Sequence, residues 1–367
     1  MTKMVRQAHH PEQNSRRIAI NGFGRIGRLL LRQICDDSRF EIVAINDLGD
    51  LANLAYLLKY DSVYREFPGE IKIKSDPKKR IHPNDPNPTN YLTVDGKEVL
   101  VLQEKDPTKL PWKDLGIDIV VEATGVFESF EKAKVHLDAG AKRVVLTAPA
   151  KDNEGVAGGK TALMGINDEE IKSAVLTSNG SCTTNAVAPV IEVLKENPGI
   201  EKAVLNTIHA YTATQTIVDG PVKGGDFRRG RAGAQNMAPS TTGAAKTVGK
   251  VIKEVDGKFD GVAIRVPIVC GSIADITFIS KKKTSVEEIN EIFKKAAASE
   301  KWQGILEVSE EPLVSSDIIG VNAAAMVDLP FTKVIDGNLV KVLAWYDNEW
   351  GYVTTLVNHI LKAGENI

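Results

Sequence analysis

A cysteine among hydroxyl side chains has the residue types needed for nucleophilic catalysis. Cys182 lies in the segment SNGSCTTN, and the following stretch AVAPVIEVLKENPG carries apolar residues at helical spacing. This pattern predicts a helix that begins at Cys182 and ends at the Asn-Pro-Gly sequence 197–199. We expect the positive end of that helix to lower the pKa of the thiol and to offer N–H groups to an anion. Cys35 and Cys270 lie in apolar surroundings, and we expect both to be structural.

A cysteine nucleophile needs a base, and His209 is the best candidate among six histidines. It lies in a predicted strand, 206–214 (NTIHAYTAT), among hydroxyl residues. An imidazole beside a cysteine can hold it as a thiolate and then exchange protons with the substrate oxygen. The pattern alone fits a hydrogen-bonded core histidine equally well. The other histidines lie in featureless segments (His9, His10, His82) or on predicted helices (His136, His359).

A basic, hydroxyl-rich segment has the composition of a phosphate site. Residues 226–245 read DFRRGRAGAQNMAPSTTGAA, and Arg265 follows in the apolar strand AIRVP. Arginine binds phosphate in a bidentate manner, while hydroxyl groups and a glycine amide complete an oxyanion cradle. The run by itself also fits a solvated basic loop. Arg265 argues against that reading, because a guanidinium inside an apolar strand needs an anionic partner. The candidates are Arg228, Arg229, Arg231, Thr241, Thr242, Gly243 and Arg265.

A GxGxxG motif lies between a predicted strand and a predicted helix. In NGFGRIG, Gly22 permits a tight turn, Gly24 lets the backbone approach a pyrophosphate, and Gly27 permits close packing of helix on strand. The next strand ends at Asp47, where a carboxylate accepts ribose hydroxyl groups. A 2′-phosphate would meet like charge at Asp47, and no arginine follows it directly. The motif therefore predicts NAD rather than NADP.

The elements that must position these residues suggest an α/β fold with two domains. Short β-branched runs alternate with amphipathic stretches in the first half, which is typical of βαβ units and a parallel sheet. From residue 202 the strands are longer and less regular, which fits a mixed or antiparallel sheet in a second, α+β domain. A helix is predicted from Tyr352 to the end, and the proline-rich segment 75–90 is predicted as a surface loop. The predicted strands are 17–21, 40–46, 117–122, 142–147, 204–212, 261–269, 273–280 and 340–347, and the first helix is 25–35.

The composition limits the classes of partner. A net charge of −2 over 367 residues gives no electrostatic reason to expect nucleic acid or an anionic membrane. Three cysteines without paired spacing favour a reducing compartment, and we expect a cytoplasmic protein. No run of about 18 apolar residues is present. Residues 1–17 lack the apolar stretch of a secretory signal and are expected to be a disordered leader.

Taken together, these motifs resemble those of phosphorylating glyceraldehyde-3-phosphate dehydrogenase. The resemblance extends from about residue 17 to the end and rests on NGFGRIG, SNGSCTTNAVAP, HAYTATQ, RRGRAGAQNMAPSTTGAAK, RVP and WYDNEWGY. It implies a Rossmann NAD-binding domain over 18–181, completed by a C-terminal helix at 348–367. It also implies a catalytic domain over 182–347, a homotetramer, and no metal.

The resemblance implies a role for each matched residue. Cys182 is the nucleophile and His209 is the base. Asn348 orients the nicotinamide amide, with Tyr352 packed nearby. The cofactor residues are Gly22, Gly24, Arg25, Ile26, Gly27, Asp47, Thr124 and Thr147. Ser181, Thr183, Thr242 and Gly243 form the inorganic phosphate site, Thr212, Thr214 and Arg229 bind the phosphate of the substrate, and Arg265 is near both.

The implied reaction is the oxidation of D-glyceraldehyde 3-phosphate to 1,3-bisphosphoglycerate through a cysteine thioester. Gly180 stands where alanine is usual, and Ala186 replaces a frequent second cysteine, but neither residue has a catalytic role. Two other functions fit the same motifs. One is erythrose-4-phosphate dehydrogenase, which releases an acid with water. The other is a non-catalytic NAD-binding regulatory protein.

Overall fold

The chain divides into two compact units. The computed structural model describes residues 15–81, 88–222, 225–365 and 367. The first unit comprises the chain up to Lys160 together with 171–178 and 360–367, and the second comprises 161–170 and 179–359. Residues 161–170 and 348–359, which the sequence assigns to the first domain, fall in the second unit by this division.

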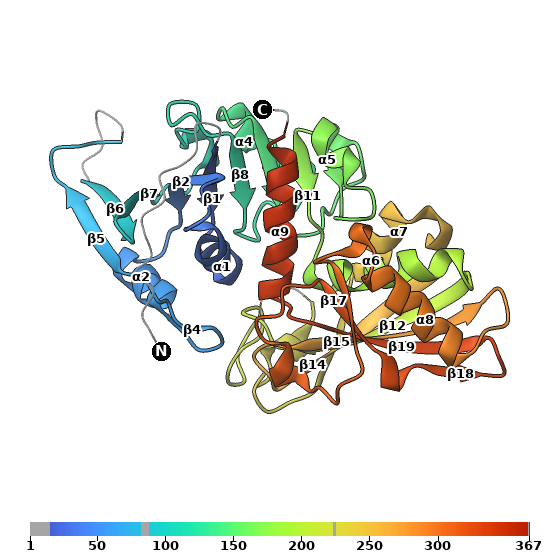
Figure 1. Ribbon diagram of the computed structural model, residues 1–367. Helices are drawn as coiled ribbons and strands as arrows, with labels where there is room; N and C mark the ends of the chain where they lie inside the picture. The colour runs from blue at the N-terminus through green and yellow to red at the C-terminus, as the bar shows by residue number, and fades with distance from the viewer. Residues whose placement is uncertain (1–14, 82–87, 223–224, 366) are drawn as a thin grey trace. The chain divides into compact units, whose positions relative to one another are not determined.

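The first unit is built on a nine-stranded sheet, which is mostly parallel as predicted (Figure 1). Its order is β10-β11-β9-β8-β1-β2-β7-β6-β5, and β1 pairs in parallel with β2 on one side and β8 on the other. The strands are β1 (Arg16–Asn21), β2 (Phe40–Asn46), β5 (Ile71–Asp76), β6 (Thr89–Val94), β7 (Lys97–Leu102), β8 (Ile119–Glu122), β9 (Arg143–Leu146), β10 (Lys160–Thr161) and β11 (Leu176–Ser178). The helices are α1 (Arg25–Ile34), α2 (Leu51–Lys59), α3 (Phe130–Ala133) and α4 (Val135–Asp138).

Several predicted boundaries in this unit were wrong. The predicted loop 75–90 is strand at both ends, because Ser75 pairs with Asn90 and Asp76 with Thr89 in an antiparallel hairpin. The middle of that loop, 82–87, lies outside the described residues. β5 is an edge strand with mostly exposed residues, and its apolar alternation is limited to Ile71 and Ile73, so nothing in the residue types marks Ser75 and Asp76 as strand. β1 begins at Arg16, one residue before the predicted strand 17–21, so Arg16 was wrongly placed in the leader; residues 1–14 lie outside the described residues.

The second unit contains an eight-stranded mixed sheet, which confirms the prediction of a second α+β fold (Figure 1). Its order is β13-β14-β12-β15-β19-β17-β16, with β18 beside β19. The strands are β12 (Ile200–Ala210), β13 (Ala238–Thr241), β14 (Phe259–Val266), β15 (Ser272–Ser280), β16 (Leu306–Ser309), β17 (Ala325–Asp328), β18 (Lys333–Ile335) and β19 (Leu339–Tyr346). The helices include α5 (Glu169–Ser173), α6 (Cys182–Glu196), α7 (Ala244–Val251), α8 (Val286–Ala297) and α9 (Trp350–Ala363), and the last residues of α9 and α5 belong to the first unit.

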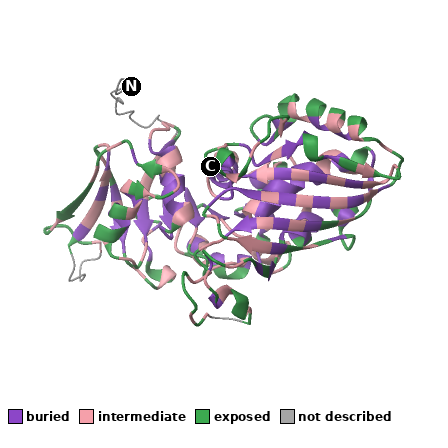
Figure 2. Ribbon diagram, turned by 90° about the horizontal axis from the view of Figure 1, so that it is seen from below, coloured by how far each residue is buried: buried purple, intermediate pink, exposed green. Residues whose placement is uncertain are grey.

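The sheet of the second unit has one buried and one partly exposed face. β15 and β19 alternate strictly between buried and half-buried residues, and Figure 2 shows this alternation along the strands. β12 ends at Ala210, so the predicted strand 206–214 was four residues too long. The following segment, 211–214, lies outside the sheet and contains the hydroxyl residues Tyr211, Thr212 and Thr214.

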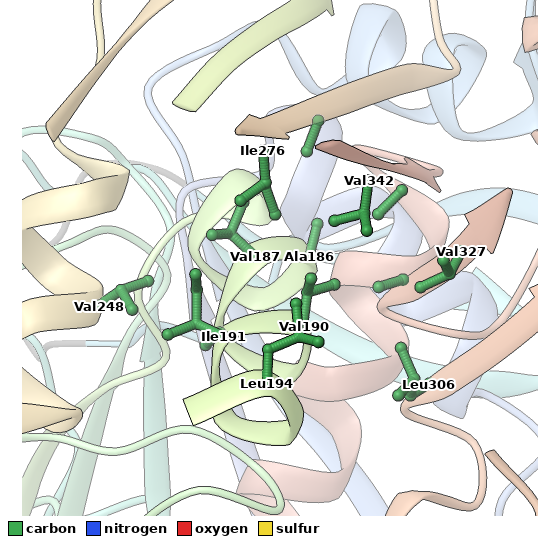
Figure 3. Close-up of a cluster of buried hydrophobic side chains, with 14 of the residues drawn as sticks. Ala186, Val187, Val190, Ile191, Leu194, Val248, Ile276, Leu306, Val327 and Val342 are labelled. Atoms are coloured by element: carbon green, nitrogen blue, oxygen red, sulfur yellow. The ribbon is translucent and has the colours of Figure 1, made fainter. Parts of the chain in front are cut away.

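Helix α6 packs against the buried face of this sheet and is fixed by it. Its apolar side recurs at helical spacing and faces Ile276 of β15 and Val342 of β19 (Figure 3). Burial of each such side chain stabilises the fold by about 1.5–3 kcal/mol. This packing holds the first turn of α6, and therefore Cys182, in place. The packed residues of α6 are Ala186, Val187, Val190, Ile191 and Leu194.

Membrane-spanning helices and metal-ligand clusters are both absent from the described residues. No helix there is both long enough and apolar enough to cross a membrane. Within the same residues, no three or more His, Cys, Asp or Glu side chains are grouped so that they would hold a metal ion.

Candidate active site

Cys182 is the first residue of α6, as the sequence predicts. Ser181 is the N-cap, and its hydroxyl accepts a hydrogen bond of 3.1 Å from the backbone N–H of Thr184. The prediction of a lowered thiol pKa was wrong for the free protein. Burial raises the pKa of Cys182, and the positive charge of Arg265 acts in the opposite direction but is the smaller effect.

His209 lies beside the thiol. Its Nε2 is 3.4 Å from the sulfur of Cys182, so the sequence-predicted base and nucleophile are within contact distance. The ring is 3% exposed and packs edge-on against Tyr346, with 5.9 Å between ring centroids. Burial, together with the charge of Arg265, lowers the pKa of His209 to about 3. The free imidazole is therefore neutral at physiological pH, which is the form that can accept a proton.

Arg265 is placed at the other nitrogen of His209. Its guanidinium is 2.7 Å from Nδ1, and it also donates to the carbonyl of Ala210 at 3.1 Å. The same carbonyl is 2.6 Å from Nδ1. In the tautomer with the proton on Nδ1, this proton points to the carbonyl of Ala210 and Nε2 can accept the thiol proton; the guanidinium, which can only donate, then bonds to that carbonyl and not to Nδ1. The neighbours of Arg265 are thus His209 and a carbonyl in place of the predicted anionic partner.

A buried chain of hydroxyl groups supports Thr183. The hydroxyl of Tyr346 lies 2.9 Å from that of Thr183 and 2.7 Å from that of Thr207, and Thr207 donates to the carbonyl of Ile273 at 3.4 Å. Each hydroxyl has one hydrogen, so the bonds run in one direction from Thr183 to Ile273. Sequence reasoning missed this role of Tyr346. The two-residue alternation of β19, which places Tyr346 on the face of Val342, was the available signal.

Arg229, Thr212 and Thr214 are brought together, as the resemblance implies. The hydroxyl groups of the two threonines are 2.9 Å apart, and Arg229 donates to that of Thr214 at 3.2 Å. Two residues that the sequence analysis missed hold this arginine. Asp226 accepts from its Nε at 3.4 Å, and Ser240 accepts from its Nη2 at 3.2 Å. Since Ser240 also donates to Asp226, the guanidinium is held from two sides.

Thr242 and Gly243 lie at the start of α7, which packs against α6. Gly243 is the N-cap, and a Cβ built on it would have no heavy atom within 4 Å. The hydroxyl of Thr242 accepts from the backbone N–H of Ala244 at 3.2 Å. Free space beside a helix N-terminus suits an anion, in keeping with the predicted phosphate role.

The glycine-rich turn in the first unit has the geometry of a dinucleotide site. Gly22 has φ +97°, and a Cβ there would lie 2.6 Å from the backbone of Ala123 and Thr124. A Cβ on Gly27 would lie 2.2 Å from the carbonyl oxygen of Gly22, so only glycine permits this approach of α1 to β1. At Gly24 a Cβ would have no heavy atom within 4 Å, which leaves room for a pyrophosphate.

The predicted ribose ligand Asp47 follows β2. Its carboxylate accepts from the N–H of Phe23 at 2.7 Å and from that of Gly49 at 2.8 Å. Asp47 thus ties the glycine-rich turn to the loop after β2. Arg25, next to Ile26 in the first turn of α1, pairs with Asp61 at 2.6 Å, and the Asp61 side chain is 4% exposed.

The remaining predicted cofactor residues are each held by a hydrogen bond, which is buried at Asn348 and Tyr352 and partly buried at Thr124 and Thr147. Asn348 accepts from the hydroxyl of Ser272 at 2.9 Å, and Tyr352 donates to the carbonyl of Gly180 at 3.2 Å. In the first unit, Thr147 donates to the carbonyl of Glu122 at 3.0 Å, and Thr124 bonds to the Glu122 carboxylate. None of these partners was foreseen from the sequence.

Comparison with known proteins agrees with this geometry. The NAD-binding domain of glyceraldehyde 3-phosphate dehydrogenase matches residues 16–130, and the C-terminal domain of that enzyme matches residues 181–348. The chain is 49% identical to glyceraldehyde-3-phosphate dehydrogenase of Thermotoga maritima over 345 residues, which are 93% of this chain and 97% of that protein. The corresponding protein of Clostridium acetobutylicum is 46% identical over 93% of this chain and 96% of its own length. That of Streptomyces coelicolor is 44% identical over 96% of this chain and 99% of its own.

These matches cover both units and confirm the resemblance drawn from the motifs. The chain belongs to the glyceraldehyde-3-phosphate dehydrogenase family, whose members are NAD-dependent oxidoreductases that act on an aldehyde.

Proposed function

We propose that this protein oxidises D-glyceraldehyde 3-phosphate with NAD and inorganic phosphate and releases 1,3-bisphosphoglycerate. The observation that carries the proposal is the pair of Cys182 and His209, with sulfur and Nε2 3.4 Å apart and Arg265 at the far side of the ring. Nucleophile, base and a fixed cation are what acyl transfer through a thioester requires.

The first step is attack of the Cys182 sulfur on the aldehyde carbon. Its proton passes to Nε2 of His209, and the two opposite charges that result lie at contact distance and stabilise each other. The positive charge of Arg265 and the N-terminus of α6 also favour the thiolate. His209 then donates its proton to the oxygen of the aldehyde and takes it back when the hemithioacetal is oxidised to a thioester.

Two anion sites serve the two phosphates. Arg229, Thr212 and Thr214 bind the phosphate of the substrate, since a guanidinium and two hydroxyl groups are already assembled there. Ser181, Thr183, Thr242 and Gly243 bind inorganic phosphate at the first turns of α6 and α7, and Arg265 contributes charge to both sites. Inorganic phosphate displaces Cys182 from the thioester, which breaks the carbon–sulfur bond and gives the acyl phosphate.

NAD fits the residues of the first unit. When bound, it accepts the hydride that leaves the hemithioacetal. The open space at Gly24 and the N-terminus of α1 suit its pyrophosphate, with Arg25 and Ile26 in that first turn. Asp47 takes the adenosine ribose and disfavours a 2′-phosphate by like charge. Thr124, Thr147, Asn348 and Tyr352 complete the cofactor contacts.

A homotetramer is supported by the partly exposed face of the second sheet. The registers align five half-buried apolar residues in one row across β14, β12, β15, β19 and β17, and Val204 and Val262 nearby are 54% and 53% exposed. A continuous apolar surface of this kind favours contact with another copy of the chain. The row consists of Ile264, Ile208, Ile273, Trp345 and Met326. A cytoplasmic location is consistent with three free cysteines.

The decisive experiment measures NADH formation from glyceraldehyde 3-phosphate, with NAD or NADP and with or without inorganic phosphate. We expect rapid reduction of NAD that depends on phosphate. Activity that is indifferent to phosphate would instead assign the acid-releasing reaction of erythrose-4-phosphate dehydrogenase, and absence of turnover would indicate a regulatory NAD-binding protein. The Cys182→Ala variant should lose turnover while it still binds NAD, and retained turnover would exclude Cys182 as the nucleophile.

A further inference from the structure

A buried polar network that the proposed mechanism does not use lies at the end of β8. Glu122 is 4% exposed and His136 of α4 is not exposed at all. Nε2 of His136 is 3.1 Å from the carboxylate, and the indole N–H of Trp112 donates to Nδ1 at 3.1 Å. Asn21 of β1 donates to the same carboxylate at 2.6 Å.

The partners fix the protonation of His136. An indole nitrogen can only donate, so Nδ1 of His136 must be the unprotonated nitrogen. The single ring proton then sits on Nε2 and points to Glu122. A second proton, on Nδ1, would face the indole N–H of Trp112. The ring of His136 is therefore a hydrogen-bond donor to the carboxylate through Nε2.

The carboxylate of Glu122 is surrounded by neutral hydrogen-bonding groups. Beside Asn21 and His136, it accepts from the N–H of Thr124 at 2.8 Å and is bonded to the Thr124 hydroxyl. The orientation of Asn21 is fixed as well, because its oxygen accepts from the amide of Asn46 at 2.8 Å. No lysine or arginine pairs with Glu122 within the described ranges. The carboxylate is thus buried without a basic side chain as counter-ion.

This charge lies at a defined place relative to the cofactor. β1 has β2 on one side and β8 on the other, so the carboxyl ends of β1 and β8 form the switch point of the sheet. The glycine-rich turn after β1 takes the pyrophosphate, and Asp47 draws the adenosine to the β2 side. The nicotinamide half would then lie on the β8 side of the switch point, and Glu122 is the last residue of β8.

We propose that Glu122 is a specificity residue for the redox state of the cofactor, because its buried carboxylate favours oxidised NAD over NADH. The oxidised nicotinamide ring carries a positive charge that NADH lacks, so the carboxylate attracts only the oxidised form. If the two charges lie about 10 Å apart, an effective dielectric constant of about 20–40 gives a preference of about 4- to 17-fold. The proposal takes NAD as the ligand and thereby rests on the proposed function.

The test compares dissociation constants of NADH, from its fluorescence, with those of NAD, from competition, on the full chain without substrate. In Glu122→Gln the preference for NAD over NADH should fall about 4- to 17-fold, as calculated from the charge. In the matched control Glu122→Asp, which keeps the charge, both affinities weaken but their ratio stays within about twofold. A merely structural role would weaken both forms alike, so an unchanged ratio in Glu122→Gln overturns the proposal. If the unaltered chain binds neither form, the proposed function fails instead.

Discussion

Replacement of Tyr346 by phenylalanine tests the hydroxyl chain behind Thr183. The substitution removes one oxygen from a residue that is 1% exposed and leaves its ring against His209. Two hydrogen bonds are lost, of 2.9 Å to Thr183 and 2.7 Å to Thr207. At about 1 kcal/mol for each neutral bond, the free energy of unfolding should fall by about 2 kcal/mol.

The bond to Thr207 can be isolated by a double-mutant cycle. Thr207→Val alone removes its bonds to Tyr346 and to the carbonyl of Ile273 and should cost about 2 kcal/mol. In the double variant with Tyr346→Phe the total should stay near 3 rather than 4 kcal/mol, because both single variants lose the same Tyr346–Thr207 bond. Urea unfolding measures these differences. Because Thr183 loses its support, the KM for inorganic phosphate should rise in Tyr346→Phe, while the KM for NAD should not change. Additive costs in the cycle, or an unchanged KM for phosphate, would refute the reasoning.

Three further predictions follow from distances and burial. Gly27→Ala places a methyl 2.2 Å from a backbone oxygen, so a cost of about 1–3 kcal/mol should weaken NADH binding and lower the melting temperature. Gly24→Ala meets no atom in the free protein and should weaken NADH binding without lowering the melting temperature. Equal melting temperatures of the two variants would count against this account. Asp226→Asn loosens the arginine at the substrate site and should raise the KM for glyceraldehyde 3-phosphate about fivefold, whereas Asp219→Asn, which loosens an exposed pair of 2.8 Å, should not. Burial lowers the pKa of His359 to about 3, below its unfolded value of about 6.5, so stability is complete above about pH 6.5 and is lost as the pH falls toward 3. His359→Gln should therefore show a smaller drop in urea midpoint between pH 7 and pH 5, and an equal drop would contradict the assignment.

The sequence predicted features that are local along the chain. The turn at Gly22 and the helix at Cys182 each depend on residues within a few positions, and both were found as expected. His209 was identified because hydroxyl residues surround it in the strand. A functional site built from residues a few positions apart can be predicted from the types and spacing of those residues.

Hydrogen-bond partners that are far apart in the sequence and are brought together by the fold could not be predicted from the residue types. Tyr346 reaches Thr183 across 163 residues, and Asn21 reaches Glu122 across 101. The thiol pKa of Cys182 was also misjudged, because the helix terminus is visible in the sequence and the burial that outweighs it is not. The end of β5 was missed for a related reason, since its last residues, Ser75 and Asp76, are polar and are held in the strand by pairing with Asn90 and Thr89.

With the proposed tetramer, the apolar row on the second sheet would link the stability of the protein to its concentration. If Ile208, Ile273, Trp345 and their neighbours are covered by another copy, association adds a mass-action term to the free energy of folding. Dilution then exposes the row, and the same chain becomes easier to unfold and more prone to aggregate at nanomolar than at micromolar concentration. Assays at high dilution would therefore underestimate the lifetime of the enzyme in a crowded, protein-rich compartment.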